Sequence, residues 1–161
     1  MEIRDFQESD VPSANALTNH FILNTNIHWG TQGASDEQFR EYWRHGTARY
    51  PWLVCMVDGR FGGYAKASAW RERDAYRFTA ETTVYVALDM HRRGIGRELM
   101  VALLERLRGA GFHAAVAGIA LPNSASVSLH ESLGFTEVGV FREVGYKQGM
   151  RLDAGFWQRL L

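Results

Sequence analysis

The residues best placed to do chemistry lie where an apolar run meets the start of an amphipathic helix. The run Thr83–Ala87 is typical of a strand, and His91–Arg97 follows it with three arginines and two glycines. The first N–H groups of a helix have no partner within it and lie at its positive end, which favours an anion. The pattern predicts a pyrophosphate site, although a solvated basic helix start would look the same over these few residues. The residues assigned to this site are Arg92, Arg93, Gly94, Ile95, Gly96 and Arg97.

Two common phosphate-binding motifs do not match this segment. A P-loop requires Lys and then Ser or Thr after its second glycine, but Gly96 is followed by Arg97 and Glu98. The dinucleotide fingerprint requires a further glycine where this chain has Leu99. The expected pyrophosphate therefore belongs to another kind of ligand.

Length and charge limit the possible function classes. A chain of 161 residues is expected to form one domain, 1–161. Its formal net charge of zero gives no overall field toward nucleic acid or a membrane surface, and we expect neither as a partner. No apolar run approaches the length of a membrane span. Cys55 is the one cysteine, so an internal disulfide is excluded and a cytoplasmic location is expected.

The elements that must position the phosphate site follow from periodicity and capping residues. Helices are expected over 9–22, 35–49, 94–109 and 123–133. Strands are expected over 2–6, 52–57, 61–70, 78–87, 114–119, 135–143 and 150–160. This order mixes antiparallel hairpins with a β-α-β crossover. It predicts an α+β fold of three layers, in which a mixed, mostly antiparallel sheet has helices on both faces.

With these elements in place, the chain resembles the GNAT superfamily of N-acetyltransferases. His91–Gly96 lies where that superfamily has its Arg/Gln-x-x-Gly-x-Gly/Ala acetyl-CoA motif, with His91 in place of Arg or Gln. A closer resemblance is to the phosphinothricin and methionine sulfoximine acetyltransferase group, and it spans nearly the whole chain. The segments that carry it are Asn19–Ile22, Arg49–Val54, Ala80–Val86, Leu121–Asn123, Leu129–Phe135, Val144–Lys147 and Gly155–Gln158.

The resemblance implies a GNAT-like fold and direct acetyl transfer from acetyl-CoA to an amine in a ternary complex. It implies acetyl-CoA as the acetyl donor, no metal, and a homodimer. The expected acceptor is the α-amine of a small amino acid-like molecule of the phosphinothricin or methionine sulfoximine type. Two alternatives stay open: transfer to another small amine or a peptide N-terminus, and a non-catalytic acyl-CoA-binding module.

For the cofactor, the resemblance implies a cradle of backbone N–H groups over 92–97 and a pantetheine arm along Val84, Tyr85 and Val86. These residues are expected to diverge from the strand near Ala117–Ile119, which leaves main-chain groups free to pair with the two amides of the arm. A core strand would carry the same residues, and both roles are compatible. Asn123 is expected to reach the same arm, although its place at a helix start is also explained by capping.

For the chemistry, Glu81 is the expected base or amine-binding group, because it lies on the same strand just before the pantetheine-pairing residues. The alternative is a structural carboxylate paired with an arginine. His130 stands where many GNAT enzymes have a tyrosine that protonates the leaving thiolate. The alternative is a histidine whose ring nitrogens are satisfied within the fold.

For the acceptor, Arg71 and Arg73 could grip a carboxylate bidentately, since the resembled group uses this loop against its acceptor. A solvated loop is the alternative. Thr83 and Glu81 complete the expected acceptor contacts. The loop Leu23–Gly33 differs from the group's usual one, which leaves the acceptor more open than the donor.

Overall fold

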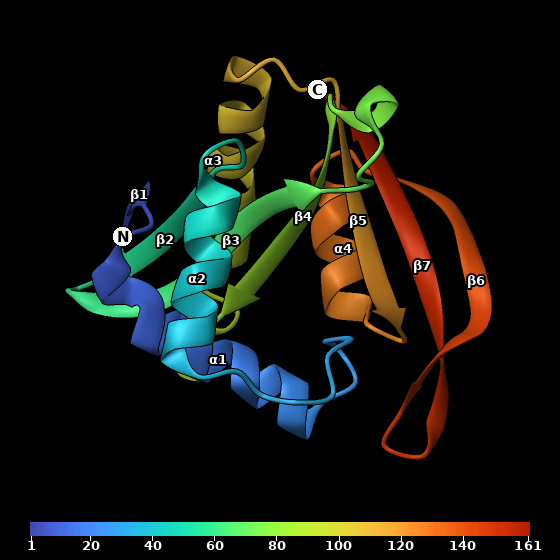
Figure 1. Cartoon of the computed structure of the whole chain (residues 1–161), viewed down its shortest axis with the longest axis horizontal. Coiled ribbons are helices and arrows are strands. Elements are labelled where there is room, and N and C mark those ends of the chain that lie inside the picture. Colours follow the sequence, from blue (N-terminus) through green and yellow to red (C-terminus); the bar gives the residue numbers. More distant parts are fainter.

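A seven-stranded sheet of order β1-β2-β3-β4-β5-β7-β6 forms the middle layer of the computed structural model, which describes residues 1–161 (Figure 1). Every neighbouring pair is antiparallel except β4 and β5. The strands are β1 Glu2–Asp5, β2 Trp52–Val57, β3 Arg60–Ala69, β4 Thr79–Val86, β5 Ala114–Leu121, β6 Thr136–Lys147 and β7 Met150–Leu160. The helices are α1 Val11–Asn24, α2 Asp36–Thr47, α3 Ile95–Gly109 and α4 Ser124–Ser132, with short 3-10 turns η1 Glu8–Asp10, η2 Asp74–Tyr76 and η3 Leu88–Met90.

The helices cover both faces of this sheet, so the predicted three-layer α+β fold is confirmed. Figure 1 shows α1 and α2 in front of the sheet and α3 behind it. One buried cluster joins α1 and α2 to the sheet through aromatic side chains such as Phe21, Trp52 and Tyr64. A larger cluster joins α3 to the opposite face through residues such as Leu99 and Leu103. None of the helices is both long and apolar enough to cross a lipid bilayer.

Some elements end later than expected. The helix expected over 9–22 continues to Asn24, and Asp10 occupies its cap position as expected, although the Asp10 carboxylate binds the Arg4 guanidinium at 2.8 Å and makes no cap hydrogen bond. The strand expected over 135–143 continues to Lys147. It resumes pairing with β7 after an irregularity between Phe141 and Gly145.

The strands β4 and β5 are joined at one end and separate at the other. They pair only over Thr79–Glu81 and Ala114–Val116, where Ala80 and Ala115 are fully buried. Beyond this point β5 stays paired with β7, and β4 stays paired with β3 (Figure 1). The expected divergence of Val84–Val86 from β5 is confirmed, and it leaves one edge of β4 without a strand partner.

Candidate active site

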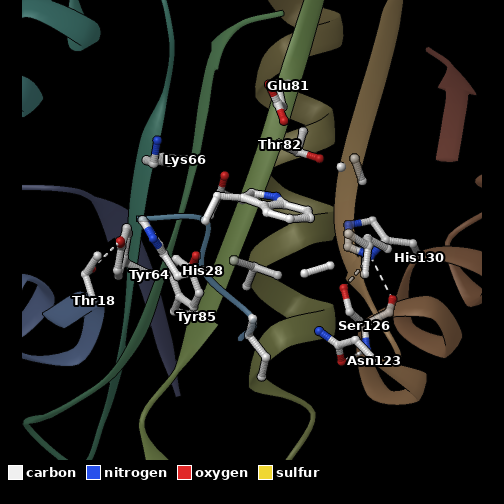
Figure 2. A pocket seen from close by; sticks show the side chains of 18 of the residues that line it. Thr18, His28, Tyr64, Lys66, Glu81, Thr82, Tyr85, Asn123, Ser126 and His130 are labelled. Carbon is white, nitrogen blue, oxygen red and sulfur yellow. Dashed lines mark hydrogen bonds between the residues drawn. The ribbon is translucent and has the colours of Figure 1, made fainter. Parts of the chain in front are cut away.

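A cavity of about 400 Å³ occupies the opening between β4 and β5. Its walls come from α1, α2, β3, β4, β5, α4 and the loop after α1, and Figure 2 shows part of this lining. The polar or titratable residues labelled there are Thr18, His28, Tyr64, Lys66, Glu81, Thr82, Tyr85, Asn123, Ser126 and His130. Most of the polar groups expected to take part in chemistry therefore meet in one place.

Glu81 lies at the point where the two strands separate. It is the last β4 residue paired with β5, and its side chain faces the α1 and α2 side with Thr83 and Tyr85. It makes no ion pair with an arginine, so the structural alternative raised for this carboxylate has no support. Burial raises the pKa of Glu81, and the charges of Lys66 and Arg71 oppose that rise. A raised pKa makes a carboxylate a better base near neutral pH.

Gly118 on β5 gives the Glu81 carboxylate its room. A methyl group added at Gly118 would lie 3.2 Å from Oε1 of Glu81 and 3.3 Å from the ring of Phe156. Both contacts are tighter than ordinary packing. The absence of a side chain at Gly118 therefore helps to define where the carboxylate rests.

His130 approaches the cavity from α4 with one ring nitrogen unsatisfied. Its Nδ1 donates to the carbonyl oxygen of Ser126 at 2.8 Å, and its Nε2 has no protein partner although the residue is only 3% exposed. Burial lowers the pKa of His130. The resting ring is therefore neutral with a bare Nε2, which accepts a proton and has none to donate. The expected donor role requires the imidazolium form first.

Asn123 caps α4, as expected. Its side-chain oxygen accepts a hydrogen bond from the N–H of Ser126 at 3.1 Å, and the residue also lines the cavity. The cap uses the amide oxygen and leaves the NH₂ group available to a ligand.

The start of α3 has the geometry expected of an anion site. Gly94 precedes the helix with φ of 80°, a conformation that glycine adopts without strain. The first α-helical bond runs from Glu98 N–H to the Gly94 carbonyl, so the N–H groups of residues 95–97 have no acceptor in the helix. Arg92, Arg93 and Arg97 are exposed and form no ion pair. The side chain of Ile95 is buried, which leaves only its backbone for a ligand.

The strand expected to hold the pantetheine arm is also part of the core. Tyr85 stacks on Phe21 with ring centroids 4.9 Å apart, while Val84 and Val86 pack toward the α3 side. His91 lies beside this strand and donates from Nε2 to the Val86 carbonyl at 3.1 Å. Packing and a free main-chain edge are thus both present.

The two arginines expected at the acceptor do not enter the cavity. Arg71 stacks on Trp70, with its guanidinium carbon 4.6 Å from the ring centroid, in a neighbouring groove. The positive charge of Arg71 still acts on Glu81, where it opposes the rise in pKa that burial causes. Arg73 is exposed just before η2 and does not line the cavity. Of the expected acceptor residues, only Glu81 and Thr83 line it.

The comparison with known proteins decides the family. A model of the acetyltransferase (GNAT) family matches residues 15–135. The chain belongs to the GNAT family. It is 40% identical to a phosphinothricin N-acetyltransferase of Streptomyces viridochromogenes, over 99% of this chain and 87% of that protein. It is 36% identical to an L-methionine sulfoximine/L-methionine sulfone acetyltransferase of Salmonella typhimurium, over 98% and 93%.

A solved structure extends the comparison to the ligand. The GNAT phosphinothricin acetyltransferase of Sinorhizobium meliloti, solved in complex with acetyl-CoA, matches with a TM-score of 0.96 and 32% identity. The match covers 99% of this chain and 88% of that one. The resemblance and the predicted activity are confirmed: this GNAT protein is an acetyl-CoA-dependent N-acetyltransferase.

The residues of this GNAT chain fit acetyl-CoA on three observations. The α3 start offers N–H groups without helical partners, β4 offers a main-chain edge without a strand partner, and His130 offers an unsatisfied Nε2 beside the cavity. The donor, when bound, supplies the activated acetyl group as a thioester. The α3 start, the β4 edge and His130 are the parts of the chain that could hold it.

Sequence reasoning singled out neither Lys66 nor Gly118, and it named the loop that contains His28 without giving that residue a role. Lys66 lies opposite Thr83 because of the β3–β4 register, which the connection between those two strands decides. The places of His28 and Gly118 likewise depend on contacts between distant elements.

Proposed function

We propose that this N-acetyltransferase transfers the acetyl group to the α-amine of a small amino acid-like acceptor, of the phosphinothricin or methionine sulfoximine type. The observation that carries the proposal is Glu81, a partly buried carboxylate without an ion-pair partner, placed where the cavity meets the divergence of β4 and β5. The named substrates of the relatives support this acceptor class. The transfer is direct, within a ternary complex.

Glu81 acts as the base in this proposal. An amine of pKa about 9 is mostly protonated at pH 7, which costs roughly 2.7 kcal/mol before it can attack. Glu81 takes that proton, directly or through one water. The amine nitrogen then bonds to the acetyl carbon and gives up a second proton to water as the carbon–sulfur bond breaks, and coenzyme A leaves as a thiolate. The raised pKa of Glu81 suits this task.

His130 is proposed as the second proton-handling group. The departing thiolate gains from a proton, and His130, whose buried Nε2 has no protein partner, lines the cavity. Because the resting ring is neutral, it serves as a donor only after taking up a proton from solvent. The role of His130 is therefore favoured at acidic pH and weakens as the pH rises.

The remaining expected contacts form a donor half and an acceptor half. In the donor half, the backbone of 92–97 holds the pyrophosphate, and Val84, Tyr85, Val86 and Asn123 face the pantetheine arm. In the acceptor half, Thr83 lines the cavity. Arg71 lies at the margin of the cavity, and Arg73 lies farther along the same loop.

An acceptor screen tests the function. Release of the coenzyme A thiol is measured with acetyl-CoA and a panel of amino acids, simple amines and short peptides. Release with methionine sulfoximine or phosphinothricin is expected. Release with peptides alone would replace the proposed acceptor, and acetyl-CoA binding with no release for any acceptor would establish a binding module instead.

We also propose a homodimer and a cytoplasmic location. The outer part of β6 exposes Val138, Phe141, Val144 and Tyr146, each at least 60% accessible, beside a groove of about 650 Å³ that Trp70 also lines. Several large exposed apolar side chains on one edge strand are typical of a protein–protein interface, and a second copy is the expected occupant. The lone buried thiol of Cys55 suits a reducing compartment.

A further inference from the structure

Lys66 is the one lysine or arginine that lines the cavity. It lies in the middle of β3, opposite Thr83 of β4. Glu81, which is opposite Ser68, is the next β4 residue on the same face of the sheet. Diagonal neighbours of this kind have their Cβ atoms about 7–8 Å apart. A positive and a negative group therefore face the same space without being paired to each other.

Aromatic side chains hold the Lys66 ammonium without neutralising it. Its Nζ donates to the Tyr42 hydroxyl at 2.5 Å. It also lies 4.7 Å from the Tyr42 ring centroid and 5.1 Å from that of Trp52. These contacts fix the position of the ammonium, but they use only one of its three N–H donors and supply no carboxylate.

The other cationic groups nearby are already engaged or uncharged. Of the 18 lysine and arginine residues, only Lys66 and Lys147 are lysines. Lys147 and Arg71 do not line the cavity: the Lys147 ammonium donates to the His28 carbonyl at 2.7 Å, and Arg71 stacks on Trp70 in the neighbouring groove. Burial and the two lysines lower the pKa of His28 to about 4, so its ring is neutral at pH 7. Lys66 alone is left to meet an anion there.

We propose that Lys66 binds an anionic group of the acceptor while the amine of the same molecule lies at Glu81. The inference rests on the proposed function, because it concerns the acceptor of that same site. Opposite charges at two fixed points select a zwitterionic or anionic amine over a simple cationic one. The anion is an oxyanion, either the α-carboxylate or an acidic group on the acceptor side chain, and the test separates these two sources.

The test compares Lys66→Met and Lys66→Arg with the wild type on three acceptors. Phosphinothricin carries a side-chain anion and an α-carboxylate, methionine sulfone carries only the α-carboxylate, and methioninamide carries neither. Lys66→Met is expected to raise KM about tenfold or more for each acceptor that has the relevant anion, since a charged hydrogen bond is lost. A raised KM for both phosphinothricin and methionine sulfone identifies the α-carboxylate as the group that Lys66 binds. A raised KM for phosphinothricin alone identifies the anionic group of its side chain.

Several controls make the result decisive. In Lys66→Met, the KM for methioninamide and the KM for acetyl-CoA are expected to stay within about twofold of the wild-type values. Lys66→Arg keeps the charge and is expected to show a smaller rise in KM for the acidic acceptors than Lys66→Met. Arg44→Met removes the same charge from the exposed side of α2, where Arg44 pairs with Glu8, and should leave every KM unchanged. Equal loss for all three acceptors, or no loss for any, would overturn the assignment.

Calorimetry separates this inference from the proposed function. If the wild type acetylates none of the acceptors, the proposed function fails, and titration of phosphinothricin into wild type and Lys66→Met still tests the lysine. Binding that depends on Lys66 would support the inference on its own. Equal binding by the two proteins, or none to either, would reject it.

Discussion

At the scale of single residues, the site contains two oppositely charged side chains that do not form an ion pair with each other. Glu81 and Lys66 face one space without an ion pair, and the Glu81 carboxylate sits where burial disfavours its charge. Both groups are therefore available to a ligand of matching charge. Such arrangements are common at active sites, where stability is given up for readiness to react.

Glu81→Gln is expected to lower kcat by about 100-fold or more and to leave the KM for acetyl-CoA nearly unchanged, because the amide cannot take a proton. In the wild type, kcat should fall as the pH drops through the raised pKa of Glu81, and the variant should lose that limb. Steady-state kinetics from pH 4.5 to 9 measures both. Glu41→Gln, an exposed change on α2, is the matched control; wild-type activity in Glu81→Gln across this range would exclude the base role.

The same substitution has an expected effect on stability. A carboxyl with a higher pKa in the folded chain binds its proton more tightly when folded, so its contribution to stability is lost as pH rises through that pKa. Glu81→Gln should therefore raise the urea midpoint at pH 8, and the gain should shrink as pH falls toward 4.5. Denaturation of both proteins at the two pH values measures this. A variant that is less stable than wild type at pH 8 would contradict it.

At the scale of elements, the β6–β7 hairpin fixes the loop that follows α1. Besides the bond from Lys147 to the His28 carbonyl, Gln148 donates from its side chain to the Leu23 carbonyl at 3.2 Å. Trp29 lies against Gly145, where an added methyl group would come within 2.6 Å of the indole ring. The wall of the acceptor half is therefore held from the far end of the sequence.

Gly145→Ala is expected to displace Trp29 and raise the acceptor KM several-fold, because the methyl group overlaps the ring. The KM for acetyl-CoA should not change, since the donor half lies on other elements. Gly109→Ala places a methyl group in open space on α3 and serves as the control. Steady-state kinetics with both substrates gives the answer; an unchanged acceptor KM would show that Trp29 is not needed there.

At the scale of the whole molecule, one part of the sheet is left open. The helices cover the faces of β1 to β5, but the outer part of β6 exposes large apolar side chains beside the Trp70 groove. Isolated exposed apolar residues are ordinary, whereas a gathered set marks an interface. The margin of the site at Arg71 adjoins this surface.

Phe141→Arg is expected to convert the proposed dimer into a monomer, because it places a charge in the apolar interface. Sedimentation velocity at several protein concentrations measures the change. Glu41→Arg adds a positive charge on α2, away from this surface, and should leave the mass unaltered. A wild type that sediments as a monomer at every concentration would refute the dimer.

Much of this molecule follows from its sequence, and the failures have a physical pattern. The capping box at Ser35 and the glycine at the start of α3, Gly94, rest on local rules, and the structure has both; the divergence of Val84–Val86, which the resemblance implied, is present as well. The expected carboxylate grip by Arg71 and Arg73 depended on how a loop folds back on the sheet, which local rules do not determine. Lys66 and Gly118 were missed for a related reason, because contacts across the sheet decide their neighbours.

The short union of β4 with β5 has a consequence for how such a scaffold changes over time. Three residue pairs near Ala80 join β4 to β5, and beyond these pairs the two strands separate without further main-chain hydrogen bonds to each other. The free edge of β4 depends on this short union, whereas the loop after α1 does not, so mutations in that loop can reshape the space around the amine without disturbing the site of the thioester carrier. An ancestral enzyme with one acetyl-CoA site can thus give rise to descendant enzymes that acetylate different acceptors.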